Sequence, residues 1–267
     1  MKKYYSIIKM RFINKLQYRA AMIGMIMKNF LFGMTEILLY MALYRSNPNA
    51  FPMGLSQVVS YMWIKQIFIA LFRVVIEDWE IYSTISSGSI CYELVRPIDL
   101  YGKWFCQSAG NRLAIMVISN LPVFLLALIV PEPYRVVLPR SLKPLFLFMV
   151  STVLAFAVVV AFAMLMYISL FYIISQRGIR IIVTAVTTFL SGSVVPLPFF
   201  PAKVLAVVKL LPFAAMQNMP LQIFCGSIEG RAAVWGVCFQ MIWFVVLLAA
   251  GKLFMRQALT RVVVQGG

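Results

Sequence analysis

Long apolar runs separated by short polar segments dominate the pattern of this chain. A helix that crosses the hydrocarbon core of a bilayer needs about 20 predominantly apolar residues, and six runs are close to or beyond that length. Their continuity favours helices, because the strands of a transmembrane barrel alternate in polarity over about 10 residues. The pattern predicts an all-α integral membrane protein whose residues 1–267 form a single transmembrane domain. The six predicted transmembrane helices lie at about residues 26–44, 57–76, 113–130, 144–174, 181–200 and 232–254.

The N-terminal arm, residues 1–20, has a different pattern. Bulky apolar residues such as Tyr4, Ile8 and Phe12 recur at helical spacing, with lysine and arginine between them. An amphipathic helix of this kind lies in the membrane interface, with its bases at anionic lipid headgroups. The arm is therefore predicted to be a cytoplasmic interfacial helix that contacts membrane lipids.

The charges follow the predicted topology. Lysine and arginine outnumber the acids by 24 to 8, which gives a formal net charge of +16. In a soluble protein this excess would suggest nucleic acid binding. Six spans place both termini on one side of the membrane, and that side carries 14 of the bases against seven on the other. Because positive charge accumulates on the cytoplasmic side, we expect both termini in the cytoplasm and no nucleic acid partner.

The residue inventory excludes several kinds of chemistry. The chain has no histidine, so no Ser-His-Asp or Cys-His nucleophile can form. Its four cysteines are widely separated, which argues against a metal or redox site. The two Gly-Lys pairs, at 102–103 and 251–252, lack the other residues of a phosphate-binding loop. We expect no catalytic residue, no metal and no cofactor in this chain.

Five of the eight acids fall between the second and third predicted spans, at Glu77, Asp78, Glu80, Glu93 and Asp99. They lie in a predicted cytoplasmic loop at residues 77–112, in which a helix ends before a proline, because the residue before proline disfavours helical geometry. An acidic folded loop facing the cytoplasm indicates a soluble partner. A solvated connector is the alternative interpretation.

Two opposite charges lie inside predicted spans. Counted from the cytoplasmic ends at 1.5 Å per residue, Glu36 lies about 15 Å and Lys65 about 16 Å along antiparallel helices. Intramembrane charges are costly and are usually paired or face a wet cavity. We therefore predict a Glu36–Lys65 pair, which either pins the first two helices together or lines a pathway.

Prolines interrupt the apolar run between the fifth and sixth spans. Irregular backbone at membrane depth is tolerated only inside protein or along a wet cavity, so residues 201–231 are predicted to form a re-entrant segment on the extracellular side. The segment is either an exit gate or an interfacial cap. The candidate gate residues are Gly192, Pro196, Pro198 and Pro201.

Three sequence runs carry a resemblance to a known family. Residues 85–90 (ISSGSI) and 93–99 (ELVRPID) resemble the segment after the second span of type 2 ABC-transporter permeases. Residues 190–201 (LSGSVVPLPFFP) resemble the proline-rich exit from the fifth span of the same proteins. The chain is most similar to a bacterial six-span exporter subfamily of about its own length.

The resemblance implies a permease subunit of an ATP-driven exporter in the bacterial cytoplasmic membrane. It implies an amphipathic substrate (a lipid, peptide or drug-like compound), a separate cytoplasmic ABC ATPase that binds ATP and Mg, and a second permease, the same or related. A coupling helix between spans two and three would dock on the ATPase. The residues to which this role transfers are Glu77, Asp78, Glu80, Gly88, Glu93, Arg96, Pro97 and Asp99.

Two other functions stay open from the residues alone. One is a membrane-embedded enzyme acting on lipid-linked substrates, which would need catalytic acids near one interface. The other is a secondary carrier that works without an ATPase.

Overall fold

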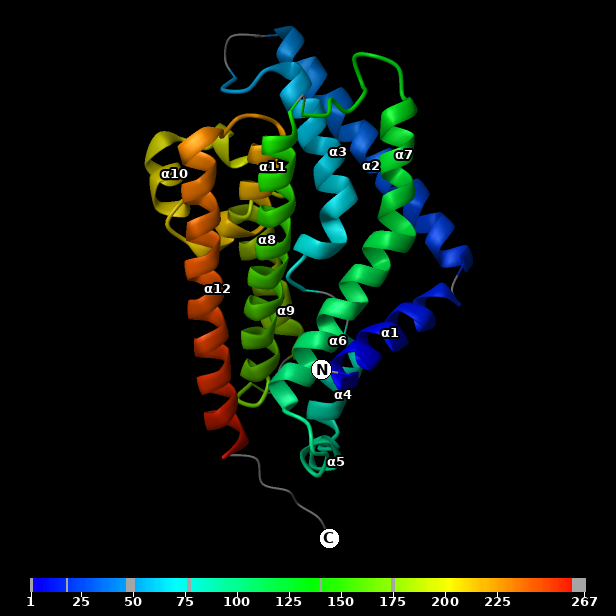
Figure 1. Cartoon of the computed structure of the whole chain (residues 1–267), viewed down its shortest axis with the longest axis vertical. Coiled ribbons are helices and arrows are strands. Elements are labelled where there is room, and N and C mark those ends of the chain that lie inside the picture. Colours follow the sequence, from blue (N-terminus) through cyan, green and yellow to red (C-terminus); the bar gives the residue numbers. More distant parts are fainter. Residues whose placement is uncertain are drawn as a thin grey trace.

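Helices stand side by side along the long axis of the computed structural model, which describes residues 2–17, 19–46, 51–75, 78–139, 141–173 and 176–260 (Figure 1). Within these residues the regular elements are helical and no strand occurs. The elements are α1 (Lys2–Leu16), α2 (Arg19–Ser46), α3 (Leu55–Phe72), α4 (Trp79–Ser86), α5 (Ile90–Leu94), α6 (Leu100–Ile115), η2 (Met116–Asn120), α7 (Leu121–Ile129), α8 (Leu142–Ser169), α9 (Gln176–Leu190), η3 (Leu197–Phe199), α10 (Ala202–Val208), η4 (Ala214–Asn218), α11 (Met219–Phe224) and α12 (Gly230–Leu259).

Five helical stretches in the described part of the chain are long and apolar enough to cross a membrane. They confirm the prediction of an all-α membrane protein and coincide with five of the six predicted runs. Their bounds are Ala21–Ser46, Leu55–Phe72, Leu100–Ile129, Leu142–Ser169 and Gly230–Leu259.

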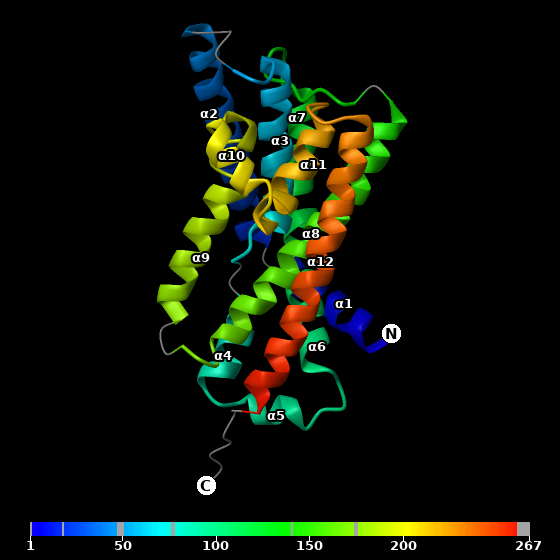
Figure 2. The same ribbon diagram turned by 90° about the vertical axis from the view of Figure 1, so that its left-hand side faces the viewer.

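The fifth predicted span is wrong in its extent. Helix α9 ends at Leu190 and has 15 residues, a length of about 22 Å at 1.5 Å per residue against a hydrocarbon core of about 30 Å. Gly192 follows with a φ of +81°, a left-handed conformation that glycine adopts without steric strain. The predicted span extends to residue 200 because the residues after this turn are also largely apolar. Figure 2 shows α9 set apart from α12, on the left of the other helices.

The predicted loop at residues 77–112 is shorter in the structure. The side chain of Asp99 accepts a hydrogen bond from the Gly102 backbone N–H, and an aspartate in this position starts a helix by satisfying a free N–H group. Residues 100–112 therefore belong to α6, which continues through the π-helical turn η2 into α7.

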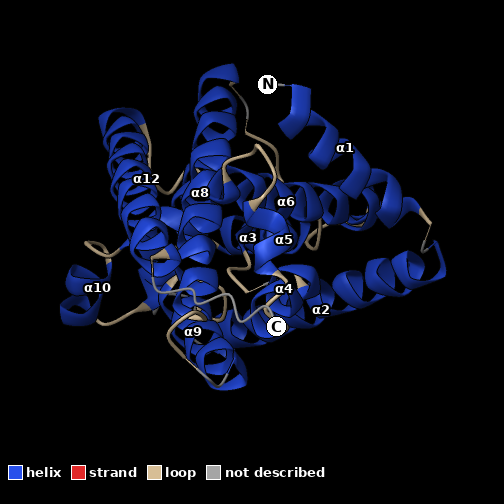
Figure 3. Ribbon diagram, turned by 90° about the horizontal axis from the view of Figure 1, so that it is seen from below, coloured by secondary structure: helices blue, strands red, loops and turns tan. Residues whose placement is uncertain are grey.

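Helix α3 is the central helix of the bundle. In its most apolar window 72% of the residues are buried, against 22–44% in the other four spans. It packs on α2, α6, α7, α8 and α11, and in the view from below it lies between α6 and α8 (Figure 3). The other spans present apolar side chains outward, as expected for helices in contact with lipid.

The two ends of the bundle differ. Helices α4 and α5 lie at the lower end in Figure 1, which we call the α5 end. Helix α10 lies toward the upper end, the α10 end, together with α11, which is buried against α8. Helix α1 crosses α6, where a Cβ on Gly110 would come within 3.1 Å of the Ile8 Cα. The side-by-side packing of α1 and α6 thus depends on a glycine.

Candidate functional site

The two short helices at the α5 end are joined by a glycine turn. Gly88, between α4 and α5, has a φ of +70°, and the backbone N–H of Gly88 donates to the carbonyl of Ile85. Helix α5 ends at Leu94, before Pro97, as the sequence predicts. The predicted coupling segment, residues 78–99 in the described structure, therefore consists of two short helices joined by a left-handed glycine turn.

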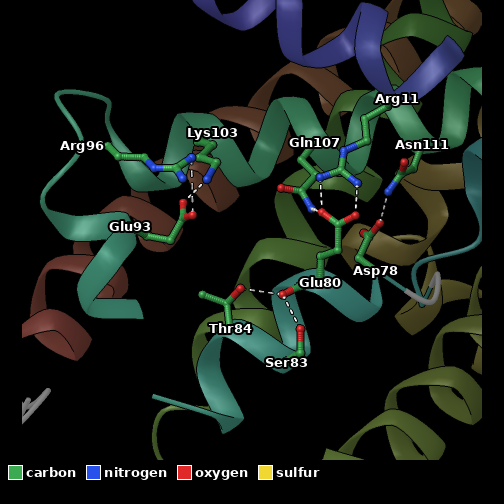
Figure 4. Close-up of polar contacts among 10 residues, drawn as sticks. All are labelled: Arg11, Asp78, Glu80, Ser83, Thr84, Glu93, Arg96, Lys103, Gln107 and Asn111. Atoms are coloured by element: carbon green, nitrogen blue, oxygen red, sulfur yellow. Dashed lines mark hydrogen bonds and ion pairs between the residues drawn. The ribbon is translucent and has the colours of Figure 1, made fainter. Parts of the chain in front are cut away.

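Glu80 ties α4 to two other helices (Figure 4). Its carboxylate accepts hydrogen bonds from both terminal nitrogens of Arg11 on α1, and the Nη1–Oε1 distance is 2.5 Å. It also accepts a hydrogen bond from the Nε2 of Gln107 on α6 at 3.2 Å. A two-pronged arginine–carboxylate contact adds geometric specificity to charge attraction. The first turn of the coupling segment is thus held against α1 and α6.

Glu93 ties α5 to α6 through an ion pair with a lysine of α6. Its carboxylate binds the Nζ of Lys103, and its Oε1 lies 3.8 Å from the Nη1 of Arg96 (Figure 4). The Nζ of Lys3 on α1 donates to the backbone carbonyl of Pro97 at 3.2 Å. Asp99, the last acid of the predicted set, is the cap of α6 described above.

Asp78 is buried, with a side chain that is closed to solvent. It accepts hydrogen bonds from Ser108 and Asn111 on α6 and from the hydroxyl of Tyr167 on α8. The Nη1 of the equally buried Arg112 lies 3.8 Å from its Oδ2. Any part that Asp78 plays in coupling therefore runs through contacts within the chain. Glu77 lies outside the described residues.

Four of the exposed side chains of this segment, on and just after α5, are apolar or basic. Tyr92 is 74% exposed and Val95 is 85% exposed, and Leu94 and the Arg96 side chain are open to solvent as well. We call these four residues, Tyr92, Leu94, Val95 and Arg96, the coupling tip. Asp78, Glu80 and Glu93 fasten the segment to other helices of the bundle, whereas the coupling tip is exposed.

The contact with Arg11 lowers the pKa of Glu80 from its ordinary value, chiefly through the hydrogen bond between the two side chains. A carboxylate with a lowered folded-state pKa contributes stability above its ordinary pKa, and this contribution is lost as the pH falls through the folded value. Arg11→Gln should therefore destabilise the chain near neutral pH, by less than about 1 kcal/mol because Glu80 is largely exposed.

The measurement is the unfolding midpoint in detergent for the unmodified chain and Arg11→Gln, near pH 7 and near pH 3. The difference between them should be smaller at the lower pH, because part of the Glu80 carboxylate is then protonated. Lys9→Gln, a change of an exposed base on the same helix, is the control. A difference of the same size at both pH values would contradict the prediction.

The structure brings together the predicted intramembrane pair. The Nζ of Lys65 on α3 lies 2.6 Å from the Oε1 of Glu36 on α2, and the Nε2 of Gln66 donates to Oε2 at 3.2 Å. Lys65 is 3% exposed and Glu36 is 28% exposed at the side chain. The two depths counted from the sequence agree because α2 and α3 are antiparallel neighbours. Whether the pair pins helices or lines a pathway stays a prediction.

The candidate gate residues lie in the segment between α9 and α10. The carbonyl of Gly192 accepts the Tyr61 hydroxyl at 3.3 Å, and the carbonyl of Ser193 accepts the Nζ of Lys65 at 3.0 Å. Pro196 precedes η3, Pro198 lies within it and Pro201 precedes α10. The structure therefore connects the predicted pair to the predicted gate, which the sequence reading treated as separate sites. We call residues 191–201 the outer segment.

Comparison with protein families decides what kind of protein carries these features. Residues 30–266 match the family model described as ABC-2 family transporter protein, which covers most of the chain. The chain belongs to the ABC-2 transporter family. A comparison with curated proteins finds none that matches it.

As a member of this family, the chain is a multi-pass permease subunit of an ABC transporter. It is a transport subunit, and the ATPase is a separate partner. The predicted resemblance is thereby confirmed. The family match and the apolar helices also agree on a membrane location.

Sequence reading missed four polar residues of this ABC-2 permease that lie around Asp78. A signal was present for three of them, because Ser108, Asn111 and Arg112 have the spacing of one helix face. Arg112 was counted only as a base of the loop, since residues 100–112 were not recognised as helix. Tyr167 gave no signal, because a tyrosine near the end of an apolar span is typical of an interface anchor.

Proposed function

We propose that this permease is part of an ATP-driven exporter of the bacterial cytoplasmic membrane that moves an amphipathic compound such as a lipid, peptide or drug-like molecule. Residues 1–267 act as one permease domain beside a second permease, the same or related. The α5 end and both termini face the cytoplasm. A separate ABC ATPase binds ATP and Mg there and supplies the driving force. The basic N-terminal arm and the excess of bases on that side support the orientation.

The observation that carries the proposal is the coupling tip. Most exposed apolar side chains of this permease lie along the long helices, where lipid would cover them. Tyr92 and Val95 instead lie on and after the short helix α5, at the far end of the bundle (Figure 1). A cluster of exposed apolar groups away from the lipid-facing helices is typical of a protein contact. An aromatic and an arginine among them match the composition of binding hot spots.

The ionic contacts behind the coupling tip support a mechanical role. Glu80 and Glu93 already have cationic partners on α1 and α6. They are therefore poor candidates for the main contact with an ATPase, and good ones for keeping the coupling segment rigid when the tip is pushed. We propose that the ATPase contacts the tip and that the acids hold the segment in place.

The test is binding of the purified permease to its ABC ATPase, for which a neighbouring reading frame with a phosphate-binding loop is the first candidate. Tyr92→Ala and Val95→Glu should each weaken the complex by about 30-fold, the factor that corresponds to about 2 kcal/mol at a binding hot spot. Val137→Glu places the same charge on an exposed valine far along the chain and serves as the control. Unchanged affinity in both tip variants would overturn the assignment of the tip.

A further inference from the structure

A groove of about 370 Å³ lies at the α5 end of the bundle, bordered by the last turns of α12. In Figure 2 the lower end of α12 lies beside α5, and the first turn of α6 also contributes to the groove. We call it the α12 groove. Among the side chains that line it are Leu94, Leu100, Tyr101, Lys252, Met255 and Arg256.

The charges along α12 place this groove at the level of the lipid headgroups. Residues 232–251 carry no charged side chain, and Arg231 and Lys252 border them. A helix rises about 32 Å between these two bases, which is close to the hydrocarbon thickness of about 30 Å. Lys252 therefore marks the edge of the hydrocarbon core at the α5 end, and Arg256 lies about 6 Å farther out along the helix.

The two bases of the groove are exposed and have no acidic partner. Within the residues that the structure describes, the ion pairs join other groups, and neither Lys252 nor Arg256 takes part in one. Being one helical turn apart, both lie on the same face of α12. Of the two acids in the groove, Glu93 is paired with Lys103, and Asp99 caps α6. Two unpaired cations therefore face one acid that has no ion-pair partner.

A buried hydroxyl without a partner also lines the groove. Tyr101 is 3% exposed, and the described structure shows no hydrogen-bond partner for its hydroxyl. A Cβ on Gly251 would come within 2.8 Å of this oxygen, so the hydroxyl lies against the residue that precedes Lys252. An unpaired buried donor costs free energy. A ligand oxygen in the groove would supply the missing acceptor.

The apolar surface around the groove suits the hydrocarbon part of a lipid. Leu100 and Met255 are buried apolar side chains of its lining. Toward the middle of the membrane, α12 continues with exposed apolar side chains such as Val245, which lies two turns before Lys252 on the same face. Acyl chains attached to a phosphate at the level of Lys252 would lie on this surface. Free phosphate would gain nothing from it.

We propose that the α12 groove binds the phosphate group of an anionic phospholipid from the leaflet at the α5 end. Lys252 and Arg256 pair with the phosphate, and the hydroxyl of Tyr101 donates to one of its oxygens. Basic pockets between membrane helices bind headgroups of this kind, and a guanidinium matches the geometry of phosphate oxygens. The inference goes beyond the proposed function, because it concerns only the permease and its lipid.

The test is native mass spectrometry of the full permease, titrated with dioleoyl-phosphatidylglycerol or with dioleoyl-phosphatidylcholine, which has the same acyl chains and no net charge. The unmodified permease should bind phosphatidylglycerol more tightly. The groove variant, Lys252→Gln with Arg256→Gln, should weaken this binding by about 30-fold, the combined contribution of two bases at a membrane surface. The control variant, Lys203→Gln with Arg231→Gln, removes two exposed bases of the α10 end and should bind as the unmodified permease does.

Tyr101→Phe provides a second measurement. It should weaken phosphatidylglycerol binding by about fivefold, the factor that one hydrogen bond contributes. The unfolding midpoint in lipid-free detergent should stay the same, because the hydroxyl has no partner in the described structure. A purely structural role of Tyr101 would instead lower the midpoint and leave lipid binding unchanged.

Three results would overturn the proposal. The first is unchanged binding of phosphatidylglycerol in both the groove variant and Tyr101→Phe. The second is an equal loss in the control variant, which would indicate attraction by net charge alone. The third is displacement of phosphatidylglycerol by inorganic phosphate as effectively as by phosphatidylglycerol itself, which would indicate a site for free phosphate and not for a lipid.

Discussion

Replacing Arg112 with methionine should lower the free energy of unfolding of this permease by about 3–5 kcal/mol, the range for removing one partner of a buried ion pair. The substitution leaves the carboxylate of Asp78 in a site closed to solvent. It also removes the donor to the carbonyls of Arg73 and Val74. Methionine fills much of the volume, so the loss reflects charge and hydrogen bonding more than a cavity.

The measurement is unfolding in mixed detergent micelles with increasing denaturing detergent, followed by tryptophan fluorescence. Arg45→Met, a change of an exposed arginine at the end of α2, should shift stability by no more than about 0.5 kcal/mol. The double variant Asp78→Asn with Arg112→Met should be more stable than Arg112→Met alone, because it removes the stranded charge. An Arg112→Met permease as stable as the Arg45→Met control would contradict the ion-pair account.

Breaking the Glu36–Lys65 pair should have the second largest effect. Lys65→Met leaves Glu36 with Gln66 as its remaining side-chain partner and removes the donor to the Ser193 carbonyl. We expect a loss of about 3 kcal/mol, comparable to the cost of one charge at the centre of a membrane helix. Glu36→Gln strands the ammonium group of Lys65, which is more deeply buried than Glu36, and should cost at least as much.

A double-mutant cycle separates the pair from its surroundings. The permease with both Glu36→Gln and Lys65→Met should be little less stable than either single variant, with a coupling energy of about 2 kcal/mol, because neither charge is then left alone. Unfolding in mixed micelles measures the cycle, and hydrogen exchange of the outer segment should rise in both variants that lack Lys65. Strictly additive losses would show that the two charges act independently.

Of the two buried charge networks behind these predictions, only one could be predicted from the sequence. The Glu36–Lys65 pair is predictable because the rise of a helix converts residue number into depth, and two successive spans are antiparallel neighbours. The Asp78 network is not predictable in this way. It joins residues that follow α3, precede α4 and lie on α6 and α8, and no periodicity relates them. Asp78 and Tyr167, for example, are 89 positions apart in the chain.

The errors at the borders of spans have local causes. Hydropathy extended the fifth predicted span to residue 200 because the residues after Leu190 remain apolar, whereas the left-handed turn at Gly192 is a matter of backbone geometry. Likewise helix α6 begins at Leu100 although it contains Lys103 and Arg112, because α1 and the coupling segment cover that part of α6 and supply partners for its charges.

The sequence alone determined the all-α membrane class, most of the spans, the excess of bases over acids and the family resemblance. All of these depend on the transfer of apolar and charged groups between water and lipid, which acts on each segment separately. Only the tertiary structure decided which groups contact one another. It shows which acids hold the coupling segment, which side chains form the coupling tip, and which residues connect α3 to α6 at one end and to the outer segment farther along. These contacts depend on distances between helices, which are set by packing and by the pairing of buried polar groups.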